Sequence, residues 1–520
     1  MAQWNKNNQD YLNQERTLFE VYMCADRYGN IDGCNGTASA NSAFGENVSV
    51  PITPVLQLDG LYGLNSERFE LYTSSTGITT SNTLMTVKTG TGAGGYSVIR
   101  SKRAVRYRPG QGALARFTAK FDEGRTGYTQ RAGFFTQEQA LQVGFNTNGK
   151  FGILRENGGK AHIHRFSITN AATGTENITV TLAGVSTTFS ILSGTTVQNS
   201  TGIGTHDFPG WVVDYNDSEV IFLSQSVGPK TGTFSIASSG TLVATSSTAQ
   251  VGIAHSDTWI YQENWNFDTL TGVGGTTNPS GVTLNPQKLN VYQINFRWLG
   301  VGEMRFAIEN PITGDMMPIH HIHYSNANDD VHLDNPSLKI GYVAAEMTGN
   351  SGIGVTVSGA SMMGAIEGII NTTTFPVAAY RTKSGSMNTT NVIYHLLTLK
   401  GNLISNNKIN TRELLIKRIT GGTTAASSSP CFLYLYINPT YSTSKLDFIP
   451  IGNASSYSTS DAIITGGTPI AMFNITSGAP DTFDLDNLRI ALPSQTKFAL
   501  AVSSSSVMQT ADCAITFIED

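Results

Sequence analysis

The sequence predicts a multi-domain, all-β protein. Its 520 residues exceed the roughly 250–300 residues at which a single hydrophobic core stops growing. Charged residues make up 14% of the chain, against about 25% in a typical globular domain, and glycine, serine, threonine and asparagine take their place. Hydrophobic residues still make up 39%, which argues against disorder. Short alternating apolar runs between turn residues favour strands, and no long amphipathic helix is predicted.

Residues 1–52 are predicted to form an N-terminal arm that docks into a neighbouring subunit. NQDYLNQERT favours a short helix, LFEVYM favours a strand, and NIDGCNGTASANSAFG has the composition of a loop. There is no apolar signal region and no run of 18 apolar residues, so we expect neither a secretory leader nor membrane insertion. The cysteines form no framework of closely spaced pairs and are expected to be reduced; they are Cys24, Cys34, Cys431 and Cys513.

Two stretches, 53–167 and 259–370, are predicted to form one jelly-roll sandwich. Both contain alternating runs rich in aromatic residues, and VYQINFRWLGVGEMRFAIE predicts an antiparallel hairpin around its LGVG turn. Residues 168–258 have fewer aromatic side chains and more serine and threonine. We interpret them as a small inserted β-module with a thin core of its own, because insertion at a loop tip costs little stability.

Residues 371–520 are predicted to form a C-terminal β-sandwich. The run NTTTFP marks its boundary, and strand-like segments follow at short intervals from VIYHLLTLKG to CAITFIED. This spacing is typical of a second jelly roll.

Four segments carry a resemblance to a known family. PVLQLDGLYG, RSKRAVRYRPGQGALARFTAKF, DTWIYQENWNFD and VYQINFRWLGVGEMRFAIENPITG, within about residues 15–370, resemble virion structural proteins of tailed phages, especially aquatic ones, and of large algal DNA viruses. The long hairpin also resembles that of concanavalin-like and laminin-G-like jelly rolls. The resemblance implies a structural component of a virus particle, such as a tail fibre, spike, vertex or minor capsid protein. It would be made in the host cytoplasm and would assemble with other virion proteins and with copies of itself, as a trimer or a pentamer.

Two other functions stay open. The chain is alternatively an adhesion module that binds a host-surface glycan, with Trp259, Trp265 and Trp298 as candidates for stacking on sugar rings, although such residues more often fill a core. The third reading is a polysaccharide hydrolase. The concanavalin-like glycosidases place their carboxylates in a Glu-x-Asp-x-x-Glu run, which this sequence lacks, so we predict that the protein is not an enzyme.

A basic run surrounds the motif RYRPGQG. Nine lysines and arginines, but only two acids, lie between Arg100 and Arg131. Arg106, Arg108 and Lys102 would share one face of a strand and could contact an acidic patch on a neighbouring subunit or another anionic partner. The alternative is a set of solvent-facing, paired charges, with PGQG as the turn between two adjacent strands. The net charge of −5 gives no reason to expect a nucleic-acid partner.

Histidine pairs supply the candidate metal ligands. His162 and His164 are two residues apart, as are His321 and His323, so each pair faces one side of a strand and could chelate a metal ion. The alternative is that they are ordinary strand residues.

Two acidic loops are candidates for calcium. Residues 326–330 (NANDD) and 484–487 (DLDN) offer oxygen ligands, although neither follows the EF-hand pattern and both suit plain turns. No other cofactor is expected.

Overall fold

The computed structural model describes residues 24–25, 31–32 and 51–520, apart from 75–76, 350–351, 369–374, 388, 426–429, 443–445, 476–477 and 479. The predicted arm therefore lies almost wholly outside the described residues, as does most of NTTTFP. Within the arm, β1 (Cys24–Ala25) pairs antiparallel with β2 (Ile31–Asp32).

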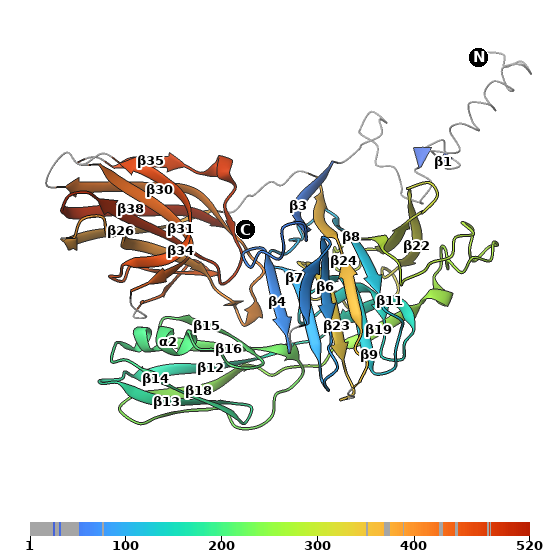
Figure 1. The fold of residues 1–520 in the computed structure, drawn as a ribbon, viewed down its shortest axis with the longest axis horizontal. Coiled ribbons are helices and arrows are strands. Elements are labelled where there is room, and N and C mark those ends of the chain that lie inside the picture. Colours follow the sequence, from blue (N-terminus) through green and yellow to red (C-terminus); the bar gives the residue numbers. More distant parts are fainter. Residues whose placement is uncertain are drawn as a thin grey trace, which may run out of the picture.

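Antiparallel sheets dominate the described residues and form three sandwich units, seen in Figure 1 as a blue-to-yellow unit, a green unit and an orange-to-red unit. Each unit has a buried apolar core of its own, because alternation along a strand gives every sheet one face that must be covered. The predicted multi-domain, all-β class is confirmed.

The first sandwich is built from two sheets that lie on either side of the largest core. One sheet contains, in spatial order, β19 (Ser256–Tyr261), β11 (Phe151–Asn157), β10 (Ala140–Phe145), β9 (Tyr128–Phe135), β23 (Lys339–Glu346), β7 (Tyr96–Ser101) and β4 (Phe69–Thr73). The other contains β22 (Met316–Ile322), β21 (Met304–Glu309), β20 (Asn290–Phe296), β8 (Ala113–Phe121), β24 (Thr356–Gly359), β6 (Leu84–Lys88) and β5 (Ile78–Ser81), while β25 (Ser361–Glu367) pairs with β8 and β3 (Ile52–Asp59). A 3-10 turn, η1 (Gln262–Asn264), follows β19.

The long hairpin predicted from the sequence is β20–β21. Tyr292 pairs with Ile308 and Ile294 with Phe306, and all four side chains are buried. The hairpin lies next to β8, so it supplies much of the aromatic core.

The motif RYRPGQG is not a turn between two neighbouring strands, as the sequence suggested. It belongs to the crossover from β7 in one sheet to β8 in the opposite sheet, and Gly110 takes a φ of 87° that favours glycine. Alternation within a strand does not reveal which sheet the next strand joins. In β8, Ala113, Ala115, Phe117 and Ala119 share one face and are buried in the first core.

The inserted module consists of two small sheets and one helix. The strands are β12 (Ala161–Asn170), β13 (Glu176–Leu182), β14 (Val185–Ile191), β15 (Trp211–Asn216), β16 (Glu219–Val227), β17 (Ser235–Ser238) and β18 (Val243–Gln250), with α2 (Thr196–Gly204) between β14 and β15. The chain enters and leaves through a paired neck, where Lys160 and Ile253 exchange two backbone hydrogen bonds.

The predicted limits of the module, 168 and 258, differ from the sheets. β12 belongs to the module, and β19, which begins at Ser256, belongs to the first sandwich. The strand-like runs of β11 and β12 are separated only by the short segment 158–160, and nothing in that segment indicates that the chain changes sheets there.

The C-terminal sandwich encloses the second core. One sheet contains β26 (Pro376–Met387), β38 (Met508–Glu519), β30 (Leu414–Ala425), β35 (Asp481–Asp484) and β36 (Ala491–Leu492). The other contains β32 (Ile449–Ile451), β33 (Ser455–Ser458), β27 (Tyr394–Gly401), β37 (Lys497–Ser504), β31 (Cys431–Tyr441) and β34 (Ile464–Ile475). A small hairpin joins β28 (Ile404–Ser405) to β29 (Lys408–Ile409), and the 3-10 turn η2 (Asp486–Leu488) follows β35.

The module packs against the C-terminal sandwich rather than standing free, and the two lie next to each other in Figure 1. Leu403 and Ile404 share an apolar cluster with Ile163 of β12. Phe448 packs edge-on against Tyr215, with ring centroids 5.7 Å apart. The insertion in the first sandwich is thus held by the last domain of the chain.

Candidate functional site

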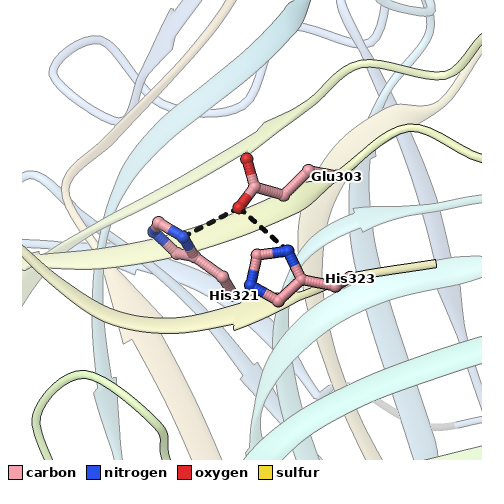
Figure 2. Close-up of side chains that lie close together, drawn as sticks. All are labelled: Glu303, His321 and His323. Atoms are coloured by element: carbon pink, nitrogen blue, oxygen red, sulfur yellow. Dashed lines mark ion pairs between the residues drawn. The ribbon is translucent and has the colours of Figure 1, made fainter. Parts of the chain in front are cut away.

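The β21–β22 hairpin gathers two imidazoles and a carboxylate on one face. Glu303 directly precedes β21, and His323 directly follows β22. His321 lies near the end of β22 and pairs with Arg305 across the hairpin. Figure 2 shows both rings turned toward the carboxylate. The Nδ1 atoms of His321 and His323 lie 2.9 and 3.5 Å from the same oxygen, Oε1 of Glu303.

The electrostatics of this cluster favour an ionised Glu303. Burial raises the pKa of the Glu303 carboxyl, but Arg305 donates to Oε2 at 2.6 Å and the net effect is a lowered pKa. Burial also lowers the pKa of His321, against the attraction of Glu303, and its ring packs against Phe267 at a centroid distance of 4.0 Å. His323 is 68% exposed, so the cluster opens to solvent on that side.

The other predicted pair, His162 and His164, has different surroundings. The two rings are stacked 6.4 Å apart, and Phe234 stacks on both of them. The His164 nitrogens already hydrogen-bond with Ser246 and Thr248. Phe234 covers both rings, and the nitrogens of His164 are already engaged by hydroxyl groups. We therefore retain only His321 and His323 as metal-ligand candidates.

A second cluster, Glu156, His255 and Asp257, was not found from the sequence. Glu156 and Asp257 stand directly opposite each other on β11 and β19, and ligand atoms of the three residues lie within 4.8 Å of one another. Burial and the nearby Glu156 raise the pKa of Asp257, whereas Arg131 pairs with Glu156. The two carboxyl groups are about a hundred positions apart in the chain, so only strand pairing unites them.

The arginines of RYRPGQG bind the other end of the same chain. Arg106 and Arg108 both form ion pairs with Asp520, and Arg103 forms a two-pronged pair with Glu413 through bonds of 2.7 Å. We expected the acidic partner on a neighbouring subunit, but the structure supplies it from the C-terminal sandwich. These residues line a cavity of about 500 Å³ between the two sandwiches.

Lys102 does not share this contact, although it was predicted to lie on the same face. Residues 102–104 follow the end of β7 and are not part of a strand, so the two-residue period does not apply. Lys102 lines a different cavity, of about 360 Å³, beside Glu70 and Asn438.

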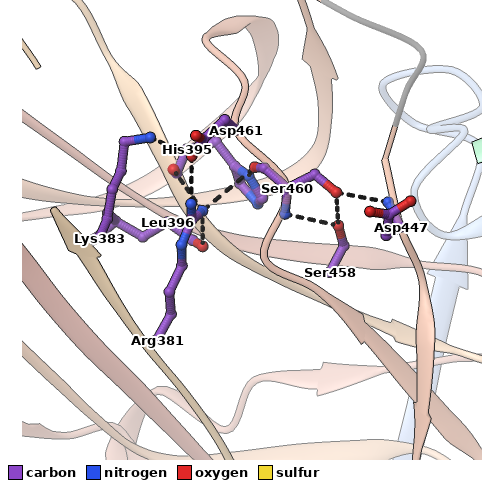
Figure 3. Close-up of polar contacts among 8 residues, drawn as sticks. All are labelled: Arg381, Lys383, His395, Leu396, Asp447, Ser458, Ser460 and Asp461. Carbon is purple, nitrogen blue, oxygen red and sulfur yellow. Dashed lines mark hydrogen bonds and ion pairs between the residues drawn. The ribbon is translucent and has the colours of Figure 1, made fainter. Parts of the chain in front are cut away.

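A polar network links β26, β27 and the segment that follows β33 in the C-terminal sandwich (Figure 3). Asp461 pairs with Arg381 and Lys383, whose side chains are almost buried. Next to them the fully buried His395 hydrogen-bonds through Nδ1 with the carbonyl of Ser460 at 2.7 Å. Burial lowers the pKa of His395 to about 4. Each of these groups has a partner, which suits a structural role.

The three predicted tryptophans differ in position. Trp265 is buried in the first core and donates to the carbonyl of Ile260. Trp298 donates to Leu333 at 2.8 Å and is half-buried. Trp259 lies on the edge strand β19, two residues from Asp257 and therefore on the same face.

Both candidate calcium loops form turns. Asp330 accepts a hydrogen bond from Tyr324, and Asp484 accepts one from the backbone N–H of Asp486. Neither loop contributes to a group of three potential metal ligands in the described part of the chain. Cys431 and Cys513 are buried, and Cys513 is a free thiol, whereas Cys34 lies outside the described residues. No helix in the described segments has the length and hydropathy to span a bilayer.

Comparisons with known proteins yielded distant likenesses only. No family model and no curated protein matches the chain. Among solved structures, an engineered GH43 glycoside hydrolase with endo-xylanase and exo-arabinofuranosidase activity is 10% identical at a TM-score of 0.25; the match covers 66% of this chain and 48% of that one. Lectin II from Ulex europaeus is 7% identical at a TM-score of 0.22, covering 60% of this chain and 99% of the lectin. A Bauhinia forficata lectin in complex with GalNAc is 8% identical at a TM-score of 0.20, and the match covers 60% of this chain and 97% of the lectin. Likeness at this level carries no functional argument.

Proposed function

We propose that this chain is a structural component of a virus particle, a building block that assembles with other virion proteins and as a trimer or pentamer with copies of itself. The observation that carries the proposal is the joining of its three sandwiches into one block. Domains linked by a single chain usually move relative to one another. Here a buried ion pair between Asp214 and Lys400 attaches the inserted module to the C-terminal sandwich. A second ion pair, between Arg108 and Asp520, attaches the first sandwich to the C-terminal sandwich.

A rigid block of this kind suits a lattice or an appendage, because each subunit must present its contact surfaces in fixed relative positions. The sequence resemblance described above points to the same class. The clamp formed by Arg106 and Arg108 then belongs to the interior of the subunit, and the contacts between subunits lie elsewhere on its surface.

The proposal is tested on purified particles and on the isolated full chain. We expect an antibody against the chain to label particles at a regular position under the electron microscope, and light scattering after gel filtration to give a closed oligomer. A tag at the C-terminus should be avoided, because Asp520 is an ion-pair partner. A monomer at all concentrations that is also absent from particles would overturn the proposal.

A second candidate function, binding of a host-surface glycan, is favoured by one observation. Trp259, Asp257 and Glu156 lie together on the face of the seven-stranded sheet that does not face the core. An aromatic ring beside carboxylates can stack on a sugar and accept its hydroxyl hydrogens.

A glycan array with the full chain tests this alternative, and Trp259→Ala is expected to abolish binding while Trp298→Phe preserves it. An array without any bound glycan rejects it. A reducing-sugar assay on polysaccharides that contain the bound glycan distinguishes binding from hydrolysis. Hydrolysis would require the facing carboxyl groups of Glu156 and Asp257. We expect no sugar release, and release that disappears in Asp257→Asn would contradict that expectation.

A further inference from the structure

We propose that Glu303, His321 and His323 form a binding site for one divalent transition-metal ion, with zinc as the best match. The site lies on the β21–β22 hairpin at the edge of the nine-stranded sheet. It is independent of the proposed role in a virus particle.

The spacing of the ligand atoms supports the proposal. Around a tetrahedral zinc ion with bonds of about 2.0–2.1 Å, neighbouring ligand atoms lie about 3.3 Å apart. The two imidazole nitrogens lie 2.9 and 3.5 Å from Oε1 of Glu303, on either side of that value, and the three ligand atoms are within 4.8 Å of one another. Small side-chain adjustments would therefore bring all three into coordination distance.

The directions of the groups also suit a metal. Both Nδ1 atoms approach the same carboxylate oxygen (Figure 2). Without a metal ion, each Nδ1 atom must carry a hydrogen, because two lone pairs facing each other would repel. A metal ion would replace both hydrogens and use the nitrogen lone pairs instead.

The surroundings supply what metal sites require outside the ligands. Arg305 donates to Oε2 of Glu303 at 2.6 Å, which fixes the carboxylate and leaves Oε1 toward the histidines, and such outer contacts orient metal ligands. Phe267 packs against His321 and holds its ring. The exposure of His323 leaves access for the ion and for a water molecule as fourth ligand.

The Glu156, His255 and Asp257 cluster is a less suitable site. Nε2 of His255 lies 3.0 Å from the carbonyl oxygen of Gln137, so this nitrogen carries a hydrogen and has no free lone pair. In the hairpin site, by contrast, His321 and His323 supply two imidazole nitrogens, and nitrogen ligands favour zinc and related ions over magnesium and calcium.

The test uses the full chain, stripped of metal with a chelator. Titration with zinc chloride in a calorimeter is expected to show one equivalent bound, and cobalt(II) is expected to give the visible absorption of tetrahedral coordination. His323→Ala, at a residue 68% exposed, should fold normally and lower zinc affinity by about tenfold or more. Glu303→Gln should do the same while keeping the shape of the side chain.

His255→Ala is the matched control, because it removes an imidazole from the other cluster and should leave the affinity unchanged. Failure of the wild-type chain to bind zinc would overturn the proposal. Equal affinity in both hairpin variants would identify the zinc as adventitious, and loss of binding in His255→Ala would assign it to the other cluster; either result also overturns it.

Discussion

Nζ of Lys400 in the C-terminal sandwich lies 2.8 Å from Oδ1 of Asp214 in the inserted module, and both side chains are no more than 3% exposed. Lys400 also donates to the carbonyl of Tyr215 and lies over the rings of Tyr215 and Phe448. The other carboxylate oxygen of Asp214 accepts the backbone N–H of Leu403 at 2.6 Å. One ion pair therefore joins two domains at a place from which water is excluded.

Removing one partner of this pair is expected to destabilise the contact between the two domains strongly. Lys400→Met leaves the Asp214 carboxylate buried without its cation, which typically costs roughly 3–5 kcal/mol. Urea-induced unfolding of the full chain measures the loss. Lys417→Met is the matched control, because the Lys417–Asp486 pair is 32% and 56% exposed and such pairs contribute at most about 1 kcal/mol. Equal effects of the two variants would contradict the assignment.

Reversing the charges of Arg106 and Arg108 is expected to loosen the C-terminal sandwich while each domain stays folded. Arg106→Glu with Arg108→Glu places carboxylates next to Asp520 and removes contacts that contribute on the order of 1–3 kcal/mol. Small-angle scattering should show a larger radius of gyration, while circular dichroism keeps its β-sheet spectrum. Adding Asp520→Arg should restore the compact form. A radius that stays unchanged in the charge-reversed chain would show that the clamp contributes nothing.

Acidification is expected to destabilise the protein between about pH 6.5 and pH 4. Burial lowers the pKa of His395 from 6.5 to about 4, and burial likewise lowers the pKa of His164, His320 and His332 to about 4. The unfolded chain therefore takes up protons in this range before the folded chain does. The stability that neutral histidines contribute is complete above pH 6.5 and declines toward pH 4, by on the order of 3 kcal/mol for His395.

Melting temperatures recorded from pH 7.5 to pH 4 test this expectation. In His395→Gln the decline should be shallower, whatever the starting stability, because Gln does not titrate. A wild-type melting temperature that does not fall in this range would refute the assignment of neutral, buried histidines.

Cys513 is expected to resist thiol reagents while the C-terminal sandwich is folded. Burial raises the pKa of its thiol to about 12, and only the thiolate reacts. Iodoacetamide at pH 8, followed by peptide mass spectrometry, should leave Cys513 unmodified in the native chain and modify it fully in urea. Rapid native modification would show that the sandwich opens readily.

Local patterns accounted for the fold class and for much of the strand content. The alternation in β20 and β21 identified their hairpin. The same period of two placed His321 and His323 on one face, but their third partner, Glu303, came only from the pairing of β21 with β22. The predicted limits of the module were misplaced because β11 and β12 have similar strand-like sequences although they belong to different sheets.

By itself, the sequence determined that this protein consists of several antiparallel sandwiches, since composition and period-two alternation express which face of a strand must be buried. Only the tertiary structure decided where the charged residues find their partners. Arg108 meets Asp520 across 412 positions, Lys400 meets Asp214 across 186, and Glu156 faces Asp257 because β19 returns to the edge of its sheet. Alternation is a local property of each strand, whereas these contacts depend on how sheets cross over and domains pack, which no single segment encodes.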